Sequence, residues 1–312
     1  MRRWNRELSL ARPVHPFIGL AERDVTAWPV TAPENRGKRE KFWVLGPSGH
    51  EWLRKEPRAG RPFERAIEAT VLRLARSVSL PAPESWLCSW TQGDDVRRGI
   101  VVKRFTRQLV RARYEFSLGG DLIRGVDSSY DPTHRGAHTL GRIRATLLRW
   151  EEALHGAGLL QQFADMVLFD AWVGNSDRHQ ENWGVLHRPV KARLAPIFDT
   201  AACLGSEQLD NYDLLADREH VRVQKYIARC GSGFGDGTTK GLLRQEHVIQ
   251  EMSAWPEWRN STRWLPKFRR ALERRLGPYL ATVPDELWPA PRRELALLLL
   301  QNRLVWLEAR VR

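Results

Sequence analysis

Three polar residues stand at a spacing that could support chemistry on a phosphate group. Asp177 and Asn182 are five positions apart in GNSDRHQEN, residues 174–182, and Asp199 directly follows the apolar run LAPIF. We expect residues 182–187 and 192–198 to form a hairpin, which returns its second strand beside its first. Asp199 should therefore come back close to Asn182, so that their oxygens gather around one point.

Phosphoryl transfer needs this set of side chains. A hard Mg²⁺ ion takes carboxylate and amide oxygens together with nucleotide phosphates and water. A separate aspartate must accept the proton of the attacking hydroxyl, or orient that hydroxyl. We therefore predict Asp177 as the catalytic base, Asn182 as a metal ligand and Asp199 as the main metal ligand, in the order of protein-kinase catalytic loops. The predicted cofactors are ATP and Mg²⁺.

The same segment resembles a known family. GNSDRHQEN followed by LAPIFD is similar to the pattern of HipA-like serine/threonine kinases, and the loop also resembles that of phosphatidylinositol 3/4-kinases. The resemblance implies an atypical kinase fold, a protein Ser or Thr as acceptor, and an antitoxin or a nucleic-acid-associated protein as partner. It points to a compact, single-domain member. The matching positions are Gly174, Asn175, Asp177, Arg178, His179, Asn182, Pro196, Phe198 and Asp199.

The resemblance also implies nucleotide-binding residues in the first third of the chain. The turn containing Gly46, Ser48 and Gly49 would cover the phosphates, and Ser48 at its tip would be placed to accept a phosphate itself. A plain turn serine is the alternative.

Lys55 is the expected phosphate ligand, with Glu68 as the carboxylate that pairs with it. Lys41, Arg54 and Lys103 compete with Lys55 for this role, and Glu64 is the alternative to Glu68. The backbone from Val102 to Phe105 would meet the adenine, and His179 would belong to the nucleotide pocket or fix the loop. Two further residues have open or structural roles: Arg178 binds phosphate or pairs with a loop carboxylate, and Asp170 is structural.

The periodicity predicts an α+β protein with a sheet-rich N-lobe followed by a helical C-lobe. The resemblance implies that this two-lobed fold is of the atypical protein-kinase type. We expect a basic N-terminal arm over 1–40 with one short strand, a β-rich N-lobe over 41–110 and a helical C-lobe over 111–312. The Gly-rich stretch 231–241 lacks the context of a dinucleotide-binding loop and is predicted to be a flexible C-lobe loop. The expected strands are 41–46, 50–56, 85–90, 99–105, 182–187 and 192–198, and the expected helices 62–78, 141–155, 159–173, 263–276 and 291–310.

Composition limits the class of protein without choosing a substrate. The chain of 312 residues carries a formal net charge of +13, which favours polyanionic partners or reflects an arginine-rich composition. Its three cysteines are far apart, and no signal peptide or membrane span is apparent, so we expect a cytoplasmic protein. Two alternatives to a protein kinase remain open: a kinase acting on a lipid or small molecule, and a nucleic-acid-binding pseudokinase scaffold.

Overall fold

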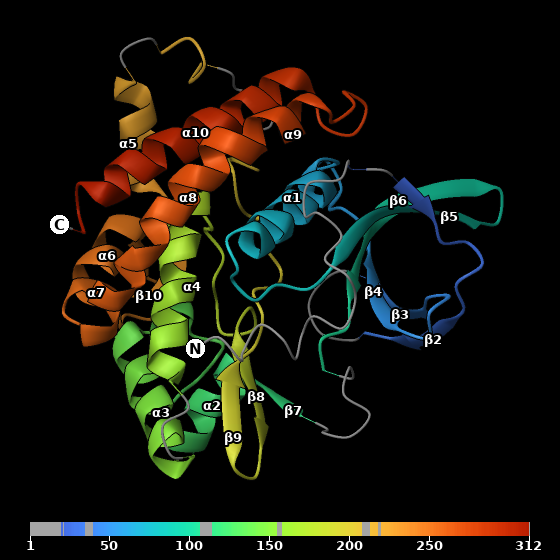
Figure 1. Ribbon diagram of the computed structural model, residues 1–312. Helices are drawn as coiled ribbons and strands as arrows, with labels where there is room; N and C mark the ends of the chain where they lie inside the picture. Colours follow the sequence, from blue (N-terminus) through green and yellow to red (C-terminus); the bar gives the residue numbers. More distant parts are fainter. Residues whose placement is uncertain are drawn as a thin grey trace.

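The architecture is α+β with two lobes, as the sequence predicts, and Figure 1 shows a curved sheet facing a larger, mostly helical part. The computed structural model describes residues 20, 22–34, 40–106, 114–154, 158–207, 213–217 and 220–311.

The N-lobe is a six-stranded sheet in the order β1-β5-β6-β4-β3-β2. β1 runs parallel to β5, and the other neighbours are antiparallel. Both predicted hairpins are present, but the predicted arm also supplies the two edge strands. Strands of three and four residues are too short for alternation to reveal them. Residues 1–19 of that arm lie outside the described residues. The strands are β1 (Glu22–Asp24), β2 (Val30–Pro33), β3 (Lys41–Leu45), β4 (Glu51–Lys55), β5 (Ser85–Gln92) and β6 (Asp95–Lys103).

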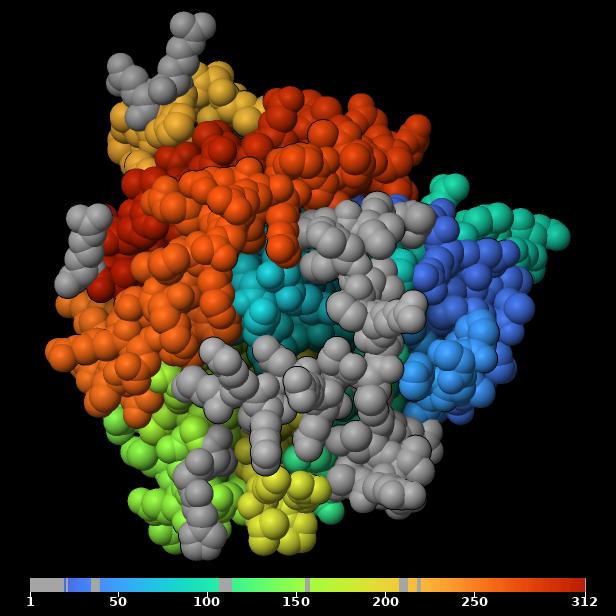
Figure 2. Space-filling model, viewed as in Figure 1, coloured from blue at the N-terminus to red at the C-terminus, as the bar shows by residue number. Residues whose placement is uncertain are grey.

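A single helix, α1 (Glu64–Ser77), covers the inner face of this sheet and links the lobes. Its side chains from Glu64 to Ala75 are all buried, because one side packs on β5 and β6 while the other faces the C-lobe. Arg73 on this helix donates to the hydroxyl of Tyr279 in the C-lobe. Figure 2 shows α1, in cyan, between the blue strands and the orange C-terminal helices.

The C-lobe is built around α4 (Leu159–Val173), which the sequence predicts with the same bounds. Thirteen of its fifteen residues are buried, as expected for a helix that is apolar on all sides. It packs against α3 (Leu140–Ala153) and α10 (Ala290–Glu308), and Trp172 stacks on Phe268 with ring centroids 4.3 Å apart. This central helix ends directly at the loop that carries Asp177.

Two smaller sheets complete the C-lobe, in the order β7-β8-β9 and as the pair β10-β11. The prediction of a flexible loop at 231–241 is wrong for its first five residues, which form β10. The predicted helix at 263–276 is also less regular than expected, since a 3₁₀ turn (Thr262–Trp264) and a π turn (Leu272–Leu276) flank α8. The remaining elements are β7 (Glu115–Leu118), α2 (Gly119–Val126), a 3₁₀ turn (Arg135–Ala137), β8 (Gly184–Arg188), β9 (Lys191–Leu194), α5 (Val221–Arg229), β10 (Gly231–Gly235), β11 (Leu242–Arg244), α6 (Gln245–Ser253), α7 (Pro256–Ser261), α8 (Leu265–Ala271) and α9 (Gly277–Ala281).

Within the described ranges, no helix is both long and apolar enough to cross a bilayer.

Candidate active site

The loop after α4 begins with residues that set its path. Gly174 ends the helix with φ +67°, and a Cβ there would lie 2.7 Å from the guanidinium of Arg303, so only glycine fits without strain. Asn175 is fully buried; its Nδ2 donates to Asp170 Oδ1 at 2.9 Å, and its Oδ1 accepts from the amide of Asp177 at 3.1 Å. The Gly-Asn pair therefore orients the backbone that presents Asp177.

A buried ion pair forms the interior of the loop. Arg178 Nε and Nη2 donate to the two carboxylate oxygens of Asp170, each at 2.7 Å, and the Arg178 side chain is fully buried. Burial alone would lower the pKa of Arg178, but the Asp170 carboxylate raises it, so the guanidinium stays charged. Its Nη1 donates to the carbonyls of Asn182 and Phe198. Of the two roles expected for Arg178, the structure shows carboxylate pairing, and the partner belongs to helix α4 and not to the loop.

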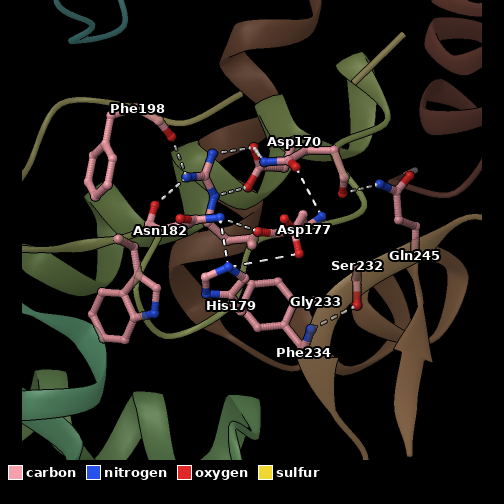
Figure 3. Close-up of polar contacts among 12 residues, drawn as sticks. Asp170, Asp177, His179, Asn182, Phe198, Ser232, Gly233, Phe234 and Gln245 are labelled. Carbon is pink, nitrogen blue, oxygen red and sulfur yellow. Dashed lines mark hydrogen bonds and ion pairs between the residues drawn. The ribbon is translucent and has the colours of Figure 1, made fainter. Parts of the chain in front are cut away.

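Asp177, His179 and Asn182 lie beside one another next to this pair, as Figure 3 shows. Asn182 Nδ2 donates to the carbonyl of Asp177 at 2.7 Å, which leaves the amide oxygen of Asn182 for another ligand. The Glu181 amide donates to His179 Nδ1 at 3.2 Å, and His179 Nε2 lies 3.2 Å from Asn182 Nδ2. The same Nε2 is 3.9 Å from Asp177 Oδ1, so the imidazole lies beside the predicted base.

Two lysines of the N-lobe form ion pairs with Asp199. Lys55 Nζ is 2.5 Å from Glu68 Oε1 and 3.4 Å from Asp199 Oδ1, and Lys41 Nζ is 3.8 Å from Asp199 Oδ2. Asp199 has φ +53°, a left-handed conformation that is unfavourable for aspartate and recurs at functional sites. The structure therefore brings together Lys55, Glu68 and Asp199, which were predicted to belong to one site. Lys55 and Asp199 are 144 positions apart in the chain.

A cleft of about 1970 Å³ runs between the lobes along these residues. Gly46 and Ser48 are not among its lining residues. Lys41 pairs with Lys55 in the β3–β4 ladder and Leu45 with Glu51, so the turn after Leu45 lies at the far end of the strands. Four residue steps put it about 13 Å from the Lys41 end. The predicted site residues that line the cleft are Gly49, Lys55, Glu68, Val102, Phe105, Asp177, His179, Asn182 and Asp199.

The register places Lys41, and not the turn at Ser48, at the end of the ladder that lies beside Asp199. Glu34 and Lys41, at the ends of the β2–β3 connection, both line the cleft, and Lys41 reaches Asp199. Residues 35–39, which include Gly37, lie outside the described residues. The turn at Gly46, Ser48 and Gly49 instead lies near the strand end at Glu51, where Arg104 binds the Glu51 side chain.

An aromatic cluster also lines the cleft. Phe105 lies 5.5 Å from Phe116 and 5.6 Å from Phe198, measured between ring centroids. Val102 and Leu118 also line this part, so a flat, apolar ring such as adenine would find a matching surface. Phe116 was missed from the sequence because β7 is only four residues long.

Strand β10 contacts the loop that holds Asp177. Nothing in the sequence indicated this contact. The amide of Arg178 donates to the carbonyl of Ser232 at 3.2 Å. Gly233 has φ +81°, and a Cβ there would lie 2.4 Å from the amide nitrogen of Arg178 and 2.9 Å from the carbonyl carbon of Asp177. The backbone of β10 therefore packs directly against the Asp177–Arg178 peptide (Figure 3).

A buried histidine joins this strand to the other end of the same loop. His138 Nδ1 donates to the Gly233 carbonyl at 3.3 Å, while its Nε2 accepts from Trp183 Nε1 at 2.9 Å. Complete burial lowers the pKa of His138 to about 3, so the ring is neutral and one nitrogen can donate while the other accepts. His138 thereby connects the strand behind Asp177 with the residue that follows Asn182.

The residues suit a metal only in combination with a polyanion. The described part of the chain contains no group of three or more His, Cys, Asp and Glu side chains that could hold a metal ion alone. Asp199 and the amide oxygen of Asn182 are oxygen donors of the kind that Mg²⁺ takes, and phosphates complete such a site in phosphoryl-transfer proteins. The donor set thus fits a phosphate-bound divalent ion.

The two lobes, the Lys-Glu pair and the Asp-containing loop define the chain as a protein with an atypical kinase fold. The family model described as HipA-like C-terminal domain matches residues 35–255. The chain therefore belongs to the HipA-like kinase family.

Two solved structures have similar folds at low sequence identity. The Helicobacter pylori proinflammatory kinase CtkA is 16% identical, with a TM-score of 0.65 over 91% of this chain and 94% of that one. HipA of Shewanella oneidensis MR-1, solved with HipB and operator DNA, is 13% identical, with a TM-score of 0.54 over 94% of this chain and 66% of that one. No curated protein matches the chain in sequence.

Proposed function

We propose that the chain is a Mg²⁺- and ATP-dependent kinase that transfers the γ-phosphate to a serine or threonine hydroxyl of a protein. The observation that carries this proposal is the contact across the cleft: Lys55, paired with Glu68, reaches Asp199 on the wall that also bears Asp177 and Asn182. A formed Lys-Glu pair beside a metal-binding aspartate is what phosphoryl transfer requires of a kinase.

Each residue has a role that follows from its position. Lys55 neutralises phosphate charge, and Glu68 holds its ammonium group in place. Asp199 and the Asn182 amide oxygen would hold Mg²⁺, which neutralises charge on the phosphates when bound. Asp177 accepts the proton of the acceptor hydroxyl while that oxygen bonds to the γ-phosphorus. The bond from this phosphorus to the bridging oxygen breaks, and its electron pair leaves with ADP.

Three finer points belong to the same proposal. A protein acceptor is supported by membership of the HipA-like family and by the fold shared with CtkA and HipA. A protein or nucleic-acid partner, comparable to those in the HipA structure, is supported by the same likeness. A cytoplasmic, reducing environment is supported by Cys88, Cys203 and Cys230, which are buried and unpaired.

Transfer of labelled phosphate from ATP tests the proposal. Wild-type protein with Mg²⁺ should label itself or a protein in a bacterial lysate, and should leave lipid vesicles unlabelled. Asp177→Asn should reduce labelling by about 100-fold or more, the range for loss of a general base. Asp199→Asn should also reduce labelling strongly, because it removes the charged ligand for Mg²⁺. Asp95→Asn, at an exposed carboxylate outside the cleft, serves as the matched control.

The possible outcomes separate the candidate functions. Labelled lipid without labelled protein would contradict a protein acceptor and favour a lipid kinase. Nucleotide binding without any transfer, in protein shown by mass spectrometry to carry no phosphate, would contradict the kinase proposal and favour a pseudokinase scaffold.

A further inference from the structure

Helix α1 places two glutamates one turn apart, and each holds a cation that lines the cleft. Glu64 and Glu68 are separated by four positions, and both side chains are only 2% exposed. Glu68 pairs with Lys55, as described above. Glu64 accepts from Arg58 Nε at 2.6 Å, lies 2.5 Å from Arg58 Nη2, and accepts from the Arg58 backbone amide at 3.2 Å.

Arg58 differs from Lys55 in its access to the open part of the cleft. Its side chain is 41% exposed, whereas that of Lys55 is 4% exposed. Glu64 engages the Nε–Nη2 edge of the guanidinium. Among the residues that the structure describes, Nη1 has no hydrogen-bond partner. Arg58 lines the same cleft as Asp177 and Asp199, so its remaining N–H groups are available to a ligand there.

The electrostatic surroundings keep this guanidinium charged and close to the two aspartates. Its hydrogen bonds to Glu64 raise the pKa of Arg58 against the opposing effect of burial, and the carboxylates of Asp177 and Asp199 raise it further. Arg58 therefore lies in the same cleft as the predicted base and the predicted metal ligand, and within electrostatic range of both.

We infer that Arg58 binds the γ-phosphate and stabilises the negative charge on the phosphoryl group as it moves from ADP to the acceptor oxygen. The inference rests on the proposed function and adds a catalytic residue to it. Glu64 acts as its positioning residue, because it fixes one edge of the guanidinium and leaves the other edge for phosphate oxygens. No further reactant is needed, since Arg58 donates hydrogen bonds and takes no proton.

A neighbouring arginine provides a matched control. Arg61 lies on the same connection between β4 and α1, and its Nη1 is 3.9 Å from Glu64 Oε1. It is not among the residues that line the cleft. A purely structural role for arginines around Glu64 would therefore make Arg58→Ala and Arg61→Ala alike in their effect on nucleotide binding.

The test compares the affinity of the protein for Mg-ADP with its affinity for Mg²⁺ and the β,γ-imido analogue of ATP. Arg58→Ala should weaken binding of the analogue by at least about 10-fold and leave Mg-ADP binding unchanged, because only the analogue carries a γ-phosphate. Phosphate transfer should fall by about 10³-fold, the lower range for arginines that act on a transferred phosphoryl group. Arg61→Ala should change neither affinity.

A second variant guards against loss of folding. Arg58→Lys can keep an ion pair with Glu64 but lacks the planar fork, so it should recover part of the analogue affinity and less of the transfer rate. Equal weakening of ADP and analogue by Arg58→Ala, or no weakening of either, would overturn the inference while leaving the kinase proposal intact. Wild-type protein that binds neither nucleotide would overturn the proposed function and this inference with it.

Discussion

Replacing Gly233 by alanine should separate the positioning of Asp177 from the stability of the fold. The new Cβ would lie 2.4 Å from the amide nitrogen of Arg178, whereas ordinary contacts begin near 3.4 Å, so one backbone must move by about 1 Å. A displacement of that size at a reacting group reduces the rate by about 100-fold. The left-handed φ of +81° adds about 1–2 kcal/mol of strain.

Gly237 is a matched control in the connection that follows β10. Its φ is +91°, but an added Cβ there would have nothing within 4 Å. Gly237→Ala should therefore carry a similar backbone strain, visible as a lower melting temperature, with little change in the turnover number. Phosphate transfer and Mg-ADP affinity of both variants, with circular dichroism to verify folding, provide the assay. If the two alanine variants lose turnover to the same extent, β10 does not position Asp177.

Three further predictions concern individual side chains. Asp170→Asn should lower the free energy of unfolding in urea by about 3 kcal/mol, because it leaves the buried Arg178 without its partner charge. Asp165→Asn should lower it by less, because its partner Arg263 is 37% exposed. Equal losses of stability in the two variants would contradict this reasoning. Below pH 6.5 the unfolded chain protonates His138 whereas the folded chain does not until about pH 3, so stability should fall by about 2 kcal/mol from pH 7 to pH 5. His138→Gln should remove that component, and an unchanged pH dependence in the variant would refute it. Ser48→Ala should leave self-labelling unchanged, because the turn lies away from Asp199, and mass spectrometry that finds phosphate on Ser48 would oppose this.

The local sequence pattern was sufficient to predict those features that depend on residues close together in the chain. Helix α4 has the predicted bounds, although the pattern was interpreted as amphipathic and the helix is buried on all sides. Gly174 marks its end because a left-handed residue is needed there. Asp177, Asn182 and Asp199 come together because one hairpin separates them. The pairing of Lys55 with Glu68 follows from a strand and a helix that are adjacent in sequence.

Distant contacts and strand register could not be read in this way. Nothing local to His138 shows that it meets Gly233, which is 95 positions away, or that Trp183 donates to it. The turn at Ser48 looked suitable for covering phosphates because it lies between two strands. The register, however, shows that Lys55 and Lys41 share the other end of the ladder. Which end of a hairpin faces Asp177 and Asp199 depends on how the lobes pack.

The two lysines on Asp199 have a consequence for the order in which ligands enter. Lys55 and Lys41 partly cancel the charge of the carboxylate that a divalent ion would need. Nucleotide phosphates would attract both ammonium groups and restore the full charge of Asp199 to the metal. Free Mg²⁺ should thus bind weakly and its affinity should rise with nucleotide, so that each ligand promotes entry of the other to the same degree.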